Sequence, residues 1–104
     1  MSKEAELSLM VAEFPMLPDQ LLENMVTMAN RIRESYMEGG LSAPMSTRVL
    51  RRWAYYYISL DRVSPEKRLP VSLMHVYALR LSAPEQDAVH ALGEGIFTDR
   101  YYKV

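Results

Sequence analysis

Apolar residues recur at helical spacing near the start of the chain. Intervals of three and four residues separate Leu21, Met25, Met28, Ile32 and Tyr36. Such intervals place side chains along one side of an α-helix. Pro18 can open this helix, because the N–H that proline lacks has no partner in a first turn, and Gly39-Gly40 ends it. The pattern predicts a helix over residues 18–37.

Two further helices follow from the same spacing. A helix over residues 47–61 has an apolar side made of Leu50, Trp53, Tyr57 and Leu60. After a loop or single turn at 64–68, Pro70 can open another helix through residue 79. Its expected inward residues, including one just beyond its end, are Met74, Tyr77, Ala78 and Leu81.

A capping box predicts the start of a last helix. In Ser82-Ala-Pro-Glu85 the serine side chain can accept from the N–H of Glu85, while the glutamate reaches back to the N–H of Ser82. Ala88, Val89, Leu92 and Ile96 give this helix its apolar side. Glycines at 93 and 95 weaken its end, and residues 99–104 are expected to form a frayed tail.

The segment before the first predicted helix is not expected to be helical. Leu9–Phe14 is short and apolar, and we expect it to be extended, as a strand whose partners lie outside this chain. The predicted fold is therefore all-α, a small antiparallel bundle of about four helices. It forms one domain over residues 1–104, with an extended lead-in at 1–16, the bundle at 17–98 and the tail at 99–104.

The composition of the chain limits the class of protein and its cellular location. The chain has 104 residues, 49% of them apolar and 24% charged, which is typical of one globular domain. It has no cysteine, which excludes disulfides and thiolate zinc sites. The sequence shows neither a signal peptide nor an apolar run of the roughly 18 to 20 residues that a membrane span needs. We expect a cytoplasmic protein without membrane contact.

Charge is unevenly distributed. Residues 1–30 hold one basic and five acidic side chains, residues 31–68 hold eight basic and four acidic ones, and the net charge of the whole chain is −1. The central segment is therefore the part suited to an anion. Its excess is too small for the basic surface expected of a duplex-binding domain, so nucleic acid is an improbable partner.

The start of the central helix carries the candidate chemistry. Ser46 is a good N-cap, and the first turn beyond it leaves free N–H groups at the positive end of the helix. Arg48 adds a planar, permanently charged guanidinium group at this end, and such a group is suited to binding phosphate. The alternative is a solvated arginine, although the helix dipole disfavours a cation there.

Other chemistry finds little support in the sequence. The glycines at 39, 40, 93 and 95 stand in no phosphate-loop motif, so this chain alone should not hydrolyse a nucleotide. His90 and Glu94 have the spacing of a metal pair, but a solvated polar pair is the simpler interpretation, and His75 lies on another helix. The aromatic run Trp53 to Tyr57 could stack on bases, but core packing is the simpler role.

The order of features resembles a known family. Phe14-Pro15, a long helix, Ser46-Thr47-Arg48, an arginine- and tryptophan-bearing helix and Leu81-Ser-Ala-Pro-Glu85 together resemble the C-terminal lid of MoxR-like AAA+ ATPases. The similarity covers about residues 9–98. The resemblance is in particular to proteins similar to the cobaltochelatase small subunit and to the nitric-oxide-reductase and Rubisco activating ATPases. Pro44-Met45 replaces the Gly-Ala that usually precedes the motif in MoxR proteins proper.

The resemblance implies a role for the motif. Arg48 would be the sensor-2 arginine that meets the γ-phosphate of ATP, with Ser46 and Thr47 beside it. ATP and magnesium would be bound mainly by an upstream AAA+ core, and this chain would have no catalytic residue and no activity of its own. Its other partners would be neighbouring subunits of a ring and a protein that the ATPase remodels.

Two alternatives come from other functional classes. Residues 47–59 could be a DNA recognition helix with Arg48, Arg51 and Arg52 near the groove, although the net charge argues against it. The chain could also be a helical adaptor that binds only other proteins. The resemblance assigns no role to Arg51 or Arg52.

Overall fold

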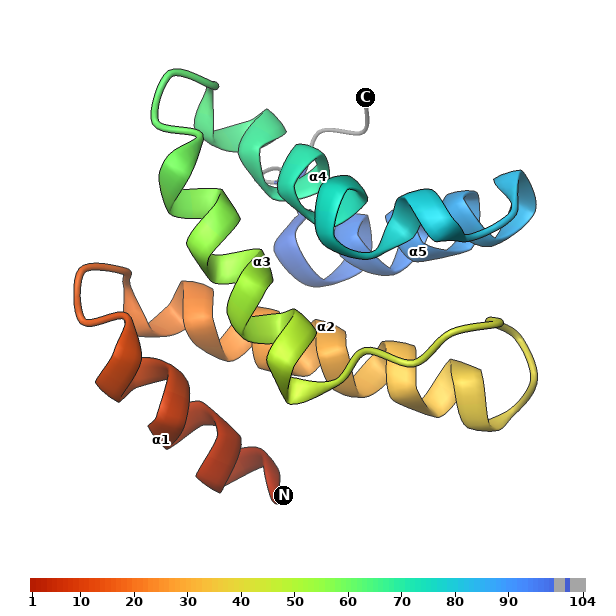
Figure 1. Ribbon diagram of the computed structural model, residues 1–104, viewed down its shortest axis with the longest axis horizontal. Helices are drawn as coiled ribbons and strands as arrows, with labels where there is room; N and C mark the ends of the chain where they lie inside the picture. The colour runs from red at the N-terminus through yellow and green to blue at the C-terminus, as the bar shows by residue number, and fades with distance from the viewer. Residues whose placement is uncertain (99–100, 102–104) are drawn as a thin grey trace.

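The computed structural model describes residues 1–98 and 101, and within them the fold is all-α. Five α-helices and one short 3₁₀ segment follow one another (Figure 1): α1 Lys3–Glu13, α2 Asp19–Met37, α3 Thr47–Ser59, α4 Pro65–Val76, η1 Ala78–Arg80 and α5 Ala83–Phe97. The predicted helical class is confirmed. The described part contains one helix more than expected, and no strand.

The additional helix replaces the predicted extended lead-in. Residues 3–13 form α1, so the expectation of an extended segment over 1–16, and of a strand at 9–14, was wrong. Ser2 caps α1 by accepting a hydrogen bond from the N–H of Ala5 at 3.1 Å. Met10 and Phe14 are fully buried, and Leu7 and Val11 are partly buried beside them, which is the spacing of one helical face.

Helix α2 is the central element. It packs against α1 and α5 and touches α3. Its apolar stripe is buried as predicted at Leu21, Met25, Met28 and Ile32, whereas Tyr36 is 40% exposed beyond the edge of the core. Gly39 ends the helix at a φ of +84°, a backbone conformation that side chains disfavour.

Helix α3 crosses α2 and packs on α4 (Figure 1). Leu50 and Trp53 are fully buried, as predicted, and the Trp53 indole N–H donates to Ser72 Oγ at 2.9 Å. Tyr57 and Leu60, also expected inside, are only partly buried. The indole N–H thus gains the buried partner it needs, which fixes the approach of α3 to α4.

Helix α4 begins earlier than predicted. Pro65 starts it at N1, so residues 65–68 are its first turn rather than a separate loop, and Pro70 lies inside the helix. The N–H groups of Lys67 and Arg68 both donate to the carbonyl of Ser64. Pro70 is the sixth residue of the helix, and because it lacks an N–H it cannot donate to the carbonyl of Glu66, so one hydrogen bond of the helix is missing there.

The capping box of α5 is confirmed. Ser82 Oγ accepts from the N–H of Glu85, and the Glu85 carboxylate accepts from the N–H of Ser82. Of the predicted tail, residues 99–100 and 102–104 lie outside the described residues. Tyr101 is buried at 4% exposure, and its ring covers Gly93, where an added Cβ would lie 2.6 Å from it. At this residue the expectation of a frayed end was wrong.

No helix in the described ranges is long and apolar enough to cross a membrane.

Candidate functional site

The start of α3 has the predicted cap. Ser46 has an extended backbone, and its Oγ accepts a hydrogen bond from the N–H of Val49 at 3.2 Å. Its carbonyl accepts from the N–H of Leu50 at 3.0 Å. Among the described residues, the N–H groups of Thr47 and Arg48 have no acceptor, so two donors remain at the positive end of the helix.

Arg48 lies at the surface. Its side chain is exposed, and it makes no hydrogen bond or ion pair with the described part of the chain. The guanidinium is thus available to an external anion beside the two donors of the helix start. This is the arrangement that the sequence predicted for a phosphate contact, and it would be lost if Arg48 were buried or paired internally.

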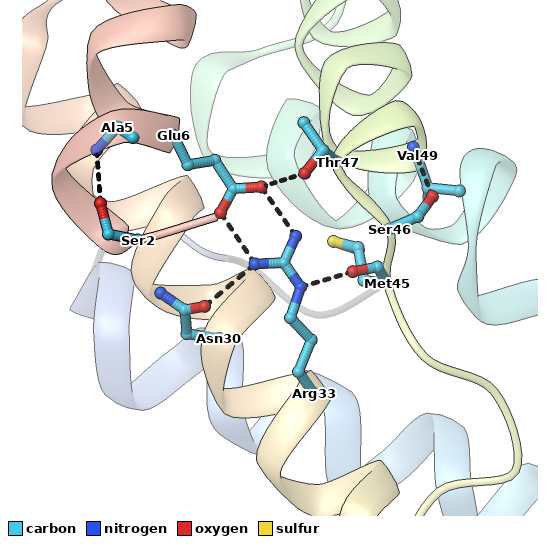
Figure 2. A network of polar contacts seen from close by, with 9 residues as sticks. All are labelled: Ser2, Ala5, Glu6, Asn30, Arg33, Met45, Ser46, Thr47 and Val49. Atoms are coloured by element: carbon cyan, nitrogen blue, oxygen red, sulfur yellow. Dashed lines mark hydrogen bonds and ion pairs between the residues drawn. The ribbon is translucent and has the colours of Figure 1, made fainter.

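Thr47 contacts another helix through its side chain, unlike Ser46 and Arg48. Its hydroxyl donates to Glu6 Oε2 at 2.7 Å, across the interface between α3 and α1 (Figure 2). Glu6 is only 1% exposed. The carboxylate also accepts two hydrogen bonds from Arg33 of α2, from Nη1 to Oε1 and from Nη2 to Oε2, both at 2.8 Å. Three elements therefore meet at one carboxylate.

Arg33 extends this cluster to the loop before α3. Its Nε donates to the carbonyl of Met45 at 2.7 Å, and its Nη1 also donates to Asn30 Oδ1 at 3.0 Å (Figure 2). Glu6 and Arg33 thereby hold the chain at residues 45 and 47, on both sides of Ser46. The side chains of Glu6, Asn30, Arg33 and Thr47, with the Met45 carbonyl, are called the α1 cluster below.

The electrostatics of the α1 cluster favour the charged form of Glu6. Burial by itself would raise the pKa of this carboxyl group. Hydrogen bonds from Arg33 and Thr47, together with the positive charge of Arg33, outweigh burial and hold the pKa below its ordinary value. Glu6 is therefore a carboxylate at neutral pH, with each oxygen accepting at least one hydrogen bond.

The loop is also held from its other side. The N–H of Ser42 donates to Glu85 Oε2 of α5 at 2.6 Å. The hydroxyl of Tyr77 donates to the carbonyl of Ala43. Both contacts anchor the loop to the half of the molecule that contains α4 and α5, so the approach to Ser46 is fixed from two directions.

Arg51 has a structural partner. Its Nε and Nη2 donate to the two oxygens of Glu13 at 2.6 and 2.9 Å, and the hydroxyl of Tyr55 donates to the same carboxylate at 2.9 Å. The hydrogen bonds from Arg51 hold the pKa of Glu13 below its ordinary value, although partial burial opposes them. Arg51 therefore joins α3 to the end of α1.

Arg52, the next residue, is exposed. It lines an open hollow of about 500 Å³ together with Tyr55, Tyr56, Ser59, His75 and Val76. His75 is exposed and stacks on Tyr56, with ring centroids 4.7 Å apart. Of the aromatic run at 53–57, only Trp53 is a fully buried core residue, so the core role predicted for the run holds for one member.

The two histidines lie in different surroundings. His90 is buried, and its Nδ1 lies 2.6 Å from the hydroxyl of Tyr101. In the described ranges, no three histidine, cysteine or acidic side chains come together as a metal site would require. Gly93 and Gly95 lie within α5 rather than in a loop.

Glu6, Asn30 and Arg33 were missed from the sequence as parts of this site. The expectation of an extended start hid the helical face that carries Glu6. The available signal was Ser2 with glutamates at positions 4 and 6, the pattern of a capped and acidic first turn. The pairing of Glu6 with residues 27 and 41 positions away had no local signal.

A comparison with known families identifies the family of the chain. Residues 6–75, more than half of the chain, match the family described as CbbQ/NirQ/NorQ C-terminal. The chain belongs to this family. The CbbQ/NirQ/NorQ C-terminal domain is the C-terminal region of MoxR-like AAA+ ATPases, so the resemblance drawn from the sequence is confirmed. The chain matches no curated protein and no solved structure.

The matched range covers the motif at 46–48 and the α1 cluster. It begins at Glu6 and includes Arg33, the motif at 46–48 and Arg51. ATP with magnesium is the cofactor expected for the complete ATPase of this family. In the described residues, the exposed guanidinium of Arg48 lies beside two N–H groups without acceptors, and no three histidine, cysteine or acidic side chains come together.

Proposed function

We propose that this CbbQ/NirQ/NorQ C-terminal domain completes the ATP site of an AAA+ ATPase through Arg48. The observation that carries the proposal is the exposed guanidinium of Arg48, unpaired within the described residues, at the capped start of α3. In this proposal the nucleotide-binding core lies upstream in the parent polypeptide. The domain has no catalytic residue and no hydrolytic activity by itself.

Arg48 acts on the phosphate end of the nucleotide. Arginine–phosphate hydrogen bonds are charge-assisted and often bidentate, so a terminal phosphate gives the guanidinium a partner that ADP lacks. Ser46 keeps the helix start in place by capping Val49. Thr47 adds its main-chain N–H, because its hydroxyl is engaged by Glu6.

Loss of the terminal phosphate would release Arg48. The domain can then adopt another arrangement relative to the core, and this change is how hydrolysis would be relayed to motion. We infer that the motion remodels a partner protein and is passed between neighbouring subunits of a ring. The ATPase so formed is expected to work in the cytoplasm. Bound ATP supplies the phosphate that Arg48 reads, and magnesium would be held by the core.

The alternatives receive less support. A DNA recognition helix would need Arg48, Arg51 and Arg52 free to face a groove, but Arg51 is held by Glu13. The family match also concerns an ATPase region rather than a DNA-binding domain. A helical adaptor without ATP would remain only if no ATPase core accompanied the domain.

The test replaces Arg48 in the complete ATPase. Arg48→Ala should lower the turnover of ATP by at least about tenfold, the effect of losing one charge-assisted interaction of about 1.4 kcal/mol or more. Arg48→Lys should also be impaired, because a point charge cannot reproduce the planar fork. Arg52→Ala is the matched control, since Arg52 is an exposed arginine one turn further along α3.

The control should keep the activity of the unmodified enzyme. Unchanged ATP affinity and unchanged turnover in Arg48→Ala would overturn the proposal. Equal losses in Arg48→Ala and Arg52→Ala would also overturn it, because they would point to the whole surface of α3 rather than to the phosphate contact.

A further inference from the structure

The first turn of α3 is held from behind by the buried carboxylate of Glu6 and the partly buried guanidinium of Arg33. Glu6 is 1% exposed and lies between α1, α2 and the start of α3 (Figure 2). It accepts the hydroxyl hydrogen of Thr47, and Thr47 directly precedes Arg48 in the chain. A shift of Thr47 therefore moves the backbone from which the Arg48 side chain extends.

The preceding residues are fixed by the same ion pair. Arg33 bonds both oxygens of Glu6 with its two terminal nitrogens and keeps its Nε for the carbonyl of Met45. The guanidinium of Arg33 therefore links the Met45 carbonyl, just before Ser46, to the Glu6 carboxylate. That carboxylate in turn binds Thr47, just after Ser46. Because the guanidinium group of Arg33 is planar and rigid, the positions of residues 45 and 47 are set together.

We propose that Glu6, Arg33 and Thr47 are positioning residues for Arg48. The inference rests on the proposed function, and it assigns the hydroxyl of Thr47 to the α1 cluster rather than to the phosphate. The cluster holds the origin of the Arg48 side chain at a fixed place relative to α1 and α2. Phosphate recognition then depends on a buried carboxylate that never touches the nucleotide.

Thr47 offers the sharpest substitution. Thr47→Val keeps the shape of the side chain but removes the hydroxyl hydrogen that Glu6 accepts, whereas Thr47→Ser keeps the hydroxyl. In the complete ATPase, Thr47→Val should reduce the preference for ATP over ADP by about three- to tenfold, the size of effect expected for the loss of one ordinary hydrogen bond. Thr47→Ser should retain most of the preference.

A double-mutant cycle separates positioning from general damage. In an Arg48→Ala background, Thr47→Val should cause no further loss of the preference for ATP, because the residue it positions is absent. An equal loss in both backgrounds would overturn the inference. So would full retention of the preference in Thr47→Val when Arg48→Ala loses it.

A second measurement does not depend on the nucleotide. In the isolated chain, Thr47→Val should speed amide hydrogen exchange at Val49 and Leu50, whose N–H groups bond to Ser46, while Thr47→Ser should leave it near the original rate. Unchanged exchange in Thr47→Val would show that the cluster does not hold the turn and would overturn the inference.

The two measurements distinguish the two proposals. If Arg48→Ala keeps the full preference for ATP, the proposed function fails, and with it the part of the inference that concerns phosphate. Accelerated exchange in Thr47→Val would then still identify the cluster as the support of the helix start. If Arg48→Ala loses the preference but Thr47→Val changes neither measurement, the inference alone fails.

Discussion

Helix α1 is joined to α3 at two places, and the two contacts use the same chemistry in different surroundings. Near its start, Glu6 accepts from Arg33 and Thr47; at its end, Glu13 accepts from Arg51 and Tyr55. Each carboxylate accepts hydrogen bonds from two nitrogens of one guanidinium group. The side chain of Glu6 is 1% exposed, whereas that of Glu13 is 17% exposed.

The difference lies in what replaces each contact when it is broken. Water can solvate Glu13 and the exposed Arg51, so their pairing contributes little to stability. Water has little access to Glu6, so the removal of one partner leaves buried polar groups without partners. The comparison teaches that the contact nearer to Arg48 is the one that fixes the helix start, and the outer contact only adds to it.

The largest expected effect is the loss of the inner carboxylate. Glu6→Ala should lower the free energy of unfolding by about 3 kcal/mol, because it leaves Arg33 and Thr47 without their buried acceptor. Glu13→Ala should change it far less. Urea unfolding of both variants measures the difference. Equal losses would contradict the contrast between the two ends of α1. If Glu6→Ala does not fold, Glu6→Gln and Glu13→Gln provide the same comparison.

Acid should weaken the inner contact. The pKa of Glu6 is below its ordinary value of 4.5 in the folded chain, so the folded state binds fewer protons near this pH than the unfolded state. The stabilisation by the carboxylate is therefore complete above about pH 4.5 and is lost as the pH falls through the folded pKa. The gap in unfolding free energy between the unmodified chain and Glu6→Gln should shrink on acidification. A gap that widened would contradict this sign.

The smallest effect is expected at the outer contact. Tyr55→Phe removes one hydrogen bond to Glu13 from a tyrosine that is 56% exposed. Its ring still packs edge-on against Phe14, with centroids 4.8 Å apart. The thermal unfolding midpoint should change little, because water replaces the lost hydroxyl. A fall as large as that of Glu6→Gln would show that the outer contact is the stronger support.

The helices that the sequence predicted best carry strong local signals. Helix α2 has a regular apolar stripe and a glycine end, and α5 has a capping box, so their existence needed no tertiary knowledge. The start of α4 was missed because Pro70 was taken as the first residue of the helix, although Pro65 has that place. Helix α1 was missed because its buried face includes the glutamate at position 6, which does not read as a core residue.

The candidate site likewise has one part that local sequence signals predict and one part that they do not. The cap at Ser46 and the exposed position of Arg48 follow from a few adjacent residues, and both could be predicted. The α1 cluster could not be predicted, because Glu6 and Thr47 are 41 residues apart and meet only after α1 folds against α2 and α3. The sequence around Arg51 likewise gave no sign that this arginine would be paired with Glu13, 38 residues away.

The most direct test of the account is the ratio of the dissociation constants for ADP and ATP in the complete ATPase, measured for the unmodified enzyme, Arg48→Ala and Arg52→Ala. Arg48 reads the terminal phosphate in this account, so the ratio should fall about tenfold or more in Arg48→Ala and stay unchanged in Arg52→Ala. A ratio that is the same in all three proteins would contradict the claim that this arginine distinguishes ATP from ADP.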